Sequence, residues 1–86
     1  MNEGKLRERM DRGEKAAALL RNEILQESFS YLENQFITAW KESGVADTDN
    51  RERIYQLLQA LTALRGHIES VVMDGKIAKS SLDGLK

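Results

Sequence analysis

The chain has 86 residues, of which 41% are apolar and 31% charged, and its 13 basic and 14 acidic side chains give a formal net charge of −1. It has no cysteine, no proline and one histidine, which excludes a disulfide framework, a thiolate metal site and a cluster of histidine ligands. No apolar run approaches the roughly 20 residues that span a bilayer. We therefore expect one small all-α domain without a membrane segment.

The first 13 residues form an arm in which acidic and basic side chains alternate. Glu3 precedes Arg7 by four residues and Glu8 precedes Arg12 by four, which is the favourable order for ion pairs on a helix. Each such pair contributes only about 0.2–0.5 kcal/mol, and Gly13 costs about 1 kcal/mol relative to alanine inside a helix. We predict that residues 1–13 are a fraying helical extension.

The next segment, from about residue 14 to residue 43, is predicted to be helical. Alanine and leucine, which favour helices, open this segment, and apolar residues recur at helical spacing as far as Trp40. Gly44 follows the last periodic residue, where a left-handed glycine commonly ends a helix. Residues 44–48 then form a short connection.

A second helix is predicted from about residue 50 to residue 74. Asp49 precedes it as an N-cap, and Glu52 lies three residues later, which is the arrangement of a capping box. Gly75 is predicted to end this helix. Residues 76–86 would then be a short C-terminal tail.

The short connection predicts an antiparallel two-helix hairpin over residues 14–75. Each helix has an apolar stripe at three- and four-residue steps, and we expect the two stripes to pack together as in a coiled coil. In the first helix the stripe consists of Ala18, Leu25, Phe29, Leu32, Phe36, Ala39 and Trp40. In the second it consists of Ile54, Leu57, Leu58, Leu61, Leu64, Ile68, Val71 and Val72.

A second apolar stripe on the first helix suggests a contact between copies of the chain. It consists of Leu6, Met10, Ala17, Leu20, Ile24 and Tyr31. One partner helix cannot cover both stripes, and burying a leucine contributes about 1.5–3 kcal/mol. We expect homo-oligomers to bury this stripe. The alternatives are that the tail folds back to cover it, with Ile77, Leu82 and Leu85, or that a different protein does.

A row of small side chains on the second helix, at four-residue steps, is a second candidate for a subunit contact. It consists of Thr62, Gly66 and Ser70. Glycine is otherwise unfavourable in the middle of a helix, and small side chains let another backbone approach closely. The alternative is a solvated face on which side-chain size has little effect.

The sequence contains no pattern typical of an enzyme, a cofactor site or a metal site. The carboxylate nearest to His67 in the sequence, that of Glu69, points to a different helix face, and neither a nucleophile elbow nor a phosphate-binding glycine loop is present. The first 21 residues have six basic side chains against four acidic ones. Nucleic-acid binding through this arm is therefore an alternative, but the interleaved acids weaken the field that phosphates require. Its contacts would be Lys5, Arg7, Arg9 and Arg12.

Residues 31–78 contain several short sequences that occur together in one group of proteins. They are an aromatic-rich helix that ends in Ala-Trp, an acidic turn D-T-x-x-R-E, the run R-G-H-I-E-S-V, and D-G-K-I-A. With these features the segment resembles small helical proteins of unassigned function encoded by tailed bacteriophages and prophages. The resemblance implies a phage product involved in head assembly or DNA packaging. It defines no catalytic residues, and the charged arm lies outside it.

From these observations we expect a non-catalytic interaction protein that acts as a homo-oligomer, in phage head assembly or DNA packaging. Its partners would be further copies of itself and other phage or host proteins, in the bacterial cytoplasm or in a virion. The alternatives are a nucleic-acid-binding module or small regulator, and a small inhibitor or adaptor that binds a host protein.

Overall fold

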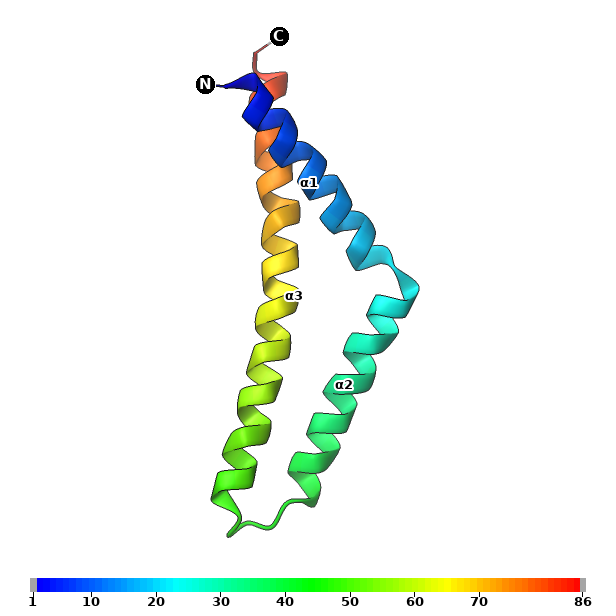
Figure 1. Ribbon diagram of the computed structural model, residues 1–86, viewed down its shortest axis with the longest axis vertical. Helices are drawn as coiled ribbons and strands as arrows, with labels where there is room; N and C mark the ends of the chain where they lie inside the picture. Colours follow the sequence, from blue (N-terminus) through cyan, green and yellow to red (C-terminus); the bar gives the residue numbers. More distant parts are fainter. Residues whose placement is uncertain (1, 86) are drawn as a thin grey trace.

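A computed structural model describes residues 2–85, and these residues are almost entirely helical, which confirms the all-α class. The helices are α1 (Glu3–Arg21), α2 (Glu23–Glu42) and α3 (Thr48–Asp83). α3 is a single rod that extends along the whole molecule, and α1 and α2 follow one another antiparallel to it, so that both chain ends lie together (Figure 1). The molecule measures 61 × 25 × 14 Å.

The predicted helix over residues 14–43 is wrong at its start and in its middle. Helical structure begins at Glu3, where the side chain of Asn2 accepts hydrogen bonds from the backbone N–H groups of Gly4 and Lys5. It is interrupted at Asn22, whose backbone is extended. The Asn22 side chain accepts a hydrogen bond of 2.9 Å from the backbone N–H of Leu25 and so caps the start of α2. The chain bends at this residue (Figure 1).

The connection between α2 and α3 also differs in detail from the prediction. α2 ends at Glu42, and Ser43 is extended, with its hydroxyl donating a hydrogen bond to the Trp40 carbonyl. The prediction of a left-handed Gly44 is wrong, because no glycine among residues 2–85 has a positive φ. Asp49 is not the N-cap of α3 but lies in its first turn, since the helix begins at Thr48.

The predicted end of the second helix at Gly75 is also wrong, because α3 continues to Asp83. Gly75 is helical and lies against Gly13 of α1. A Cβ atom built on either glycine would be 2.7 Å from the Cα atom of the other, so the two backbones approach more closely than side chains would permit. The absence of a side chain at Gly75 therefore serves a helix crossing and not a helix end.

The predicted arm and tail pack against each other. Leu6 from the arm and Ala78 from the tail are 2% and 0% exposed, and Ala16 is also buried in the α1–α3 contact. Residues 2–13 and 76–85, which lie in the predicted arm and tail, therefore provide the most tightly packed part of the fold. Towards the other end of the molecule, the buried apolar side chains are Phe29 of α2 and Ile54 of α3.

Candidate oligomerisation surface

The molecule is a single layer of helices. Its smallest extent is 14 Å, against 25 Å and 61 Å along the other two axes. Helical domains normally bury apolar faces between two layers. Its radius of gyration is 18.3 Å, whereas about 12 Å is expected for a compact domain of this length. The layer thus has two broad faces that no other part of residues 2–85 covers.

The exposed area leads to the same conclusion. A compact monomer of 9.8 kDa exposes about 5,200 Å², whereas this chain exposes 6613 Å². The excess of roughly 1,400 Å² is larger than the roughly 800 Å² that each partner buries in a standard interface. Many large apolar side chains contribute to it, among them Leu19, Leu32, Leu57, Leu64, Met73 and Ile77.

α3 carries an apolar heptad repeat that extends beyond the predicted stripe of residues 54–72. In a coiled coil, the residues at positions a and d of each heptad face the partner helix. The a positions are Ile54, Leu61, Ile68, Gly75 and Leu82, and the d positions are Leu57, Leu64, Val71 and Ala78, while Leu85 continues the spacing just beyond the end of the helix. The repeat includes the small residues of the α1–α3 crossing and runs unbroken over residues 54–82.

The two rows of this repeat are buried to different degrees where α2 packs on α3. Ile54 at position a is 6% exposed, whereas Leu57 and Leu64 at position d are 44% and 53% exposed. The same difference is found in α2, where Phe29 is 5% and Leu32 is 40% exposed. In α2 the a positions are Phe29 and Phe36, and the d positions are Leu25, Leu32 and Ala39. The α2–α3 contact therefore covers the a rows and leaves much of the d rows open.

Along one flank of the α2–α3 contact, arginine side chains lie over aromatic rings, although Trp40 remains 41% exposed. The guanidinium carbon of Arg51 lies 3.9 Å from the centroid of the Trp40 ring. That of Arg65 lies 4.8 Å from the Phe29 centroid, and its Nη2 atom is 3.9 Å from Oε2 of Glu33. Arg51, Arg65, Glu33 and Trp40 all occupy position e, and antiparallel helices place their e positions on the same flank. We call this the closed flank.

The opposite flank has no such cover among residues 2–85. Positions d and g of both helices lie there, since e and g are on opposite sides of the contact. We call it the open flank, defined by Leu32, Ala39, Leu57 and Leu64. The neighbouring g positions are Ser28, Gln35, Ala60 and His67. None of these four is an Asp, Glu, Lys or Arg, but the g positions nearer the α2–α3 turn are Glu42 and Arg53, so the open flank is free of acidic and basic side chains only away from that turn.

The bend at Asn22 divides the stripe that the sequence predicts as a subunit contact. Leu6 is packed against α3, so almost none of its surface is available to a partner, and the prediction fails for this residue. Ala17 and Leu20 are half-buried. Ile24 and Tyr31 are 67% and 63% exposed. They lie about 140° and 160° around α2 from Phe29, and so on the outer surface of that helix.

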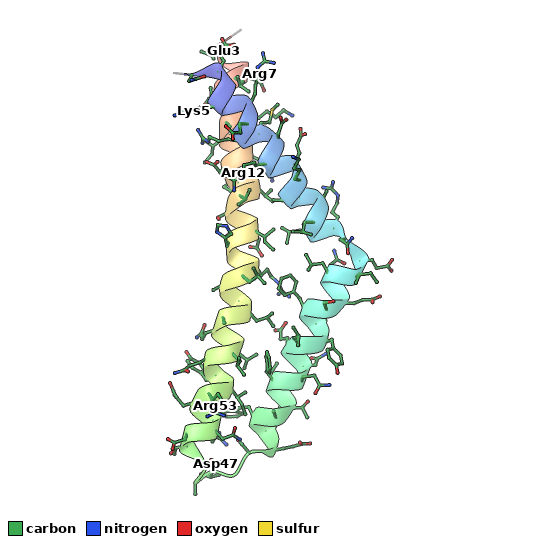
Figure 2. The ribbon with its side chains drawn as sticks, in the orientation of Figure 1. Glu3, Lys5, Arg7, Arg12, Asp47 and Arg53 are labelled. Carbon is green, nitrogen blue, oxygen red and sulfur yellow. The ribbon has the colours of Figure 1, made fainter. Side chains whose placement is uncertain are left out.

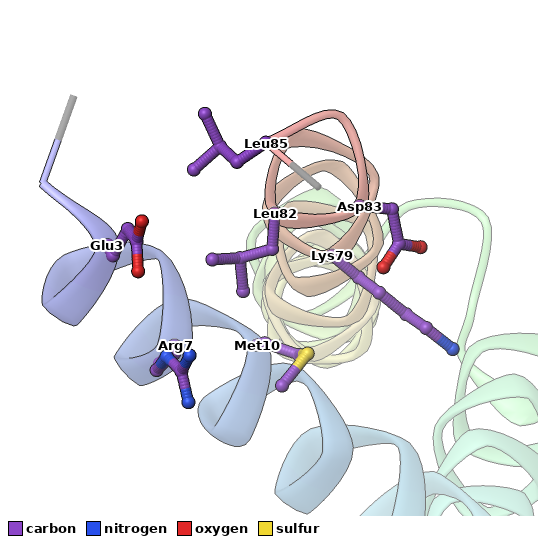
Figure 3. Close-up of a pocket in the computed structure, with 7 residues that line it drawn as sticks. All are labelled: Glu3, Arg7, Met10, Lys79, Leu82, Asp83 and Leu85. Atoms are coloured by element: carbon purple, nitrogen blue, oxygen red, sulfur yellow. The ribbon is translucent and has the colours of Figure 1, made fainter.

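Met10, the remaining member of the stripe, lines a hollow between α1 and α3 near the chain ends. Its volume is about 280 Å³, and its lining consists of Glu3, Arg7, Met10, Lys79, Leu82, Asp83 and Leu85. Figure 3 shows Met10 and Leu82 lying between the two helices. In the predicted alternative, a folded-back tail covers the stripe with Ile77, Leu82 and Leu85. Leu82 and Leu85 do line this hollow, but at the end of a straight α3 and just beyond it, and Ile77 is 54% exposed.

Two further hollows follow along the same side of α3. One of about 160 Å³ lies beside the glycine crossing, and one of about 410 Å³ lies at the bend, where Leu20, Gln26, Arg65 and Glu69 take part in its lining. The residues of α3 that line the three hollows include a row at three- and four-residue steps, namely Arg65, Glu69, Val72, Lys76, Lys79 and Asp83. Basic and acidic groups both occur in this row, with Val72 among them, whereas the linings of the first two hollows are mainly apolar.

The predicted row of small residues lies on the surface of α3. Thr62 and Ser70 are exposed, and a Cβ atom built on Gly66 would meet no other atom within 4 Å. The Ser70 hydroxyl donates a hydrogen bond of 2.6 Å to the His67 carbonyl. The close backbone approach in this chain is made at Gly13 and Gly75 instead. A subunit contact through the row of small residues stays a prediction.

The predicted basic contacts lie at the end of the molecule that holds both chain ends (Figure 2). Arg9 is engaged there: its Nη2 atom donates a hydrogen bond of 2.7 Å to Oδ1 of Asp74, and its Nε atom one of 3.0 Å to Oδ2. These hydrogen bonds, with the positive charges of Arg9 and Arg12, lower the pKa of Asp74. Lys5, Arg7 and Arg12 are exposed.

Beyond these surfaces, the described part of the chain offers few sites for chemistry. No three His, Asp or Glu side chains of residues 2–85 are grouped so that they could hold a metal ion. No helix in this range has both the length and the apolar character needed to cross a bilayer. What the arrangement can do is bury further apolar surface against another helical surface. Comparisons with family models, with curated proteins and with solved structures give no match.

Proposed function

We propose that this protein is a non-catalytic helical interaction protein that works as a homo-oligomer. The observation that carries the proposal is the single-layer architecture, in which roughly 1,400 Å² more surface is exposed than in a compact monomer of this mass. Burial of apolar area is the dominant favourable term in association. A chain that leaves Leu32, Leu57 and Leu64 half exposed has a strong driving force to associate.

The resemblance of residues 31–78 to small phage proteins suggests where such an oligomer acts. We place it in the head assembly or DNA packaging of a tailed bacteriophage, in the bacterial cytoplasm or in a virion. A small oligomer of rods suits a structural or adaptor role, because it presents several copies of one surface to a larger partner. Phage or host proteins would be the partners at that stage.

The proposal is tested by the mass of the purified protein in solution. Size-exclusion chromatography with multi-angle light scattering is expected to give at least twice the chain mass of 9.8 kDa. The mass should fall towards that of one chain on dilution, as expected for a reversible assembly. A mass of 9.8 kDa across the accessible concentration range would refute homo-oligomerisation and favour the adaptor that binds a host protein.

The structure gives the nucleic-acid alternative little additional support. At the end that carries Lys5, Arg7 and Arg12, α3 contributes Lys76 and Lys79, but it also contributes Asp74 and Asp83. The ion pair with Asp74 also neutralises Arg9. We expect no retention on duplex DNA at physiological salt. Retention that falls steeply with added salt, and that is lost when Lys5 and Arg7 are both changed to glutamine, would favour nucleic-acid binding over the homo-oligomeric interaction protein.

A further inference from the structure

We infer that a second copy of this chain packs on the open flank, so that the α2–α3 contacts of two copies together form the core of a four-helix bundle. The inference rests on the proposed function and adds to it the surface by which the copies meet. In a bundle of this kind, the a and d positions of all helices point to a common core. In the single chain only the a rows reach such a core, because Leu32, Leu57 and Leu64 remain 40–53% exposed.

The difference between the two flanks indicates which side the second copy takes. The closed flank is occupied by Arg51 over Trp40 and by Arg65 over Phe29. A partner on that side would have to displace both arginines from their rings. The open flank has apolar side chains at seven-residue steps, Leu32 and Ala39 on α2 and Leu57 and Leu64 on α3, which is the spacing of position d in a coiled coil.

The chemistry of the open flank favours a copy of the same chain over a different protein. A two-fold contact places the same surface patch on both partners, so any charge near the axis faces the same charge. The d and g positions between residues 32 and 39 and between residues 57 and 71 include no Asp, Glu, Lys or Arg, and the charged g positions Glu42 and Arg53 lie beyond them, near the α2–α3 turn. The closed flank, with Glu33, Arg65 and Glu69, would place like charges in proximity.

The area is also sufficient. A standard interface buries about 800 Å² on each partner, and the chain exposes roughly 1,400 Å² more than a compact monomer. Covering the open flank of one hairpin with that of another would account for a large share of this excess. When two copies bury each other's open flank, the helices of each copy gain the second layer that a helical core needs.

The first test compares charged substitutions on and off the open flank. The double variant Leu57→Glu and Leu64→Glu is expected to reduce the mass in light scattering to that of one chain. The matched control is Ile24→Glu with Tyr31→Glu, since these side chains are at least as exposed but lie on the outer surface of α2. The control should keep the wild-type mass. The reverse result, with only the control monomeric, would overturn the inference and leave homo-oligomerisation intact.

A second test does not require the monomer to be stable. The chain has no cysteine, so Leu64→Cys and Tyr31→Cys each introduce a single thiol. The two side chains have similar exposure in one chain, and a second copy on the open flank would cover only residue 64. Alkylation by iodoacetamide should then be roughly tenfold or more slower in the Leu64→Cys variant than in the Tyr31→Cys variant, because a thiol reacts only where it is accessible.

The combined outcomes separate the two proposals. Equal alkylation rates in a protein that light scattering shows to be oligomeric would reject the open flank and keep the proposed function. A monomeric wild-type protein rejects both. Protection of residue 64 that appears only in complex with a different protein would mean that a heterologous partner takes the open flank, and would also overturn the inference.

Discussion

Gly13 of α1 and Gly75 of α3 lie in backbone-to-backbone contact, 62 positions apart in the sequence. A Cβ atom on Gly13 would be 2.7 Å from the Cα atom of Gly75 and 3.2 Å from the Val71 carbonyl oxygen. These obstacles are backbone atoms, which cannot move out of the way as the end of a side chain can. The crossing therefore requires glycine at both positions, although glycine is unfavourable inside each helix.

Gly13→Ala is expected to destabilise the protein even though alanine favours helices. Overpacking costs about 1–3 kcal/mol, while the gain in helix propensity is at most about 1 kcal/mol. Gly66→Ala is the matched control, because its new methyl group meets no atom within 4 Å. The control should gain about 0.5–1 kcal/mol. Urea unfolding at one protein concentration gives both values, and a Gly13→Ala variant as stable as Gly66→Ala would contradict the contact.

The ion pair between Arg9 and Asp74 predicts a stability that depends on pH. The pKa of Asp74 is lower in the folded protein than its ordinary value of 3.8. The folded state therefore binds fewer protons, and the pair contributes stability above that value and loses it as the pH falls through the lowered pKa. Asp74→Asn should lower the melting temperature near neutral pH, and the difference from the wild type should vanish in strong acid.

Both side chains of this pair are largely exposed, so its contribution should be modest and should shrink in high salt. Asp11→Asn, at an exposed position of α1, is the control for loss of an acidic charge at this end of the molecule. If Asp74→Asn and Asp11→Asn melt alike at every pH, the pair does not stabilise the fold. Arg9→Gln should reproduce the effect of Asp74→Asn, and the double variant should add little to either.

Asn22 determines where α1 ends and α2 begins. Its side chain caps α2 through the N–H of Leu25, and the Gln26 side chain donates a hydrogen bond of 2.9 Å to the Leu20 carbonyl, which the interruption leaves without a helical partner. Asn22→Ala removes the cap and should cost about 0.5–2 kcal/mol. Asn34→Ala, at an exposed position within α2, should be neutral or slightly stabilising. Equal effects in urea unfolding would argue against a capping role.

The residues that decide the fold explain how much of it could be predicted. Periodic leucine and isoleucine predict two helices joined by a connection over residues 44–48. The all-α class is confirmed and a connection does lie between Glu42 and Thr48, but the described residues form three helices where the sequence predicts a two-helix hairpin. Asn22 was missed because asparagine is only a moderately poor helix residue and caps a helix only when its backbone is extended. Gly75 was misread because a glycine that ends a helix and one that permits a close crossing look the same in sequence.

The open flank was only partly accessible to sequence analysis. The heptad steps through Leu57 and Leu64 are visible in the sequence, and so is their continuation through Ala78 to Leu82 and Leu85. Which half of the stripe remains uncovered depends on the arginines of the closed flank and on the bend at Asn22. Both features arise only when the helices pack together, so no local sequence pattern predicts them.

Removing the last turns of α3 should destabilise α1, which lies at the other end of the sequence. Deletion of residues 76–86 removes Ala78 and Leu82, which pack with α1, and exposes Leu6, whose burial contributes about 1.5–3 kcal/mol. Circular dichroism at 222 nm should show a loss of helix beyond the eight helical residues removed, Lys76 to Asp83, because the first turns of α1 lose the contact in which Leu6 is buried. Deletion of residues 84–86 alone, which follow the helix, is the control and should leave the spectrum unchanged. If the longer deletion lost only its own helical residues, α1 would be stable by itself and residues 1–13 would be the independent arm that their charges predict.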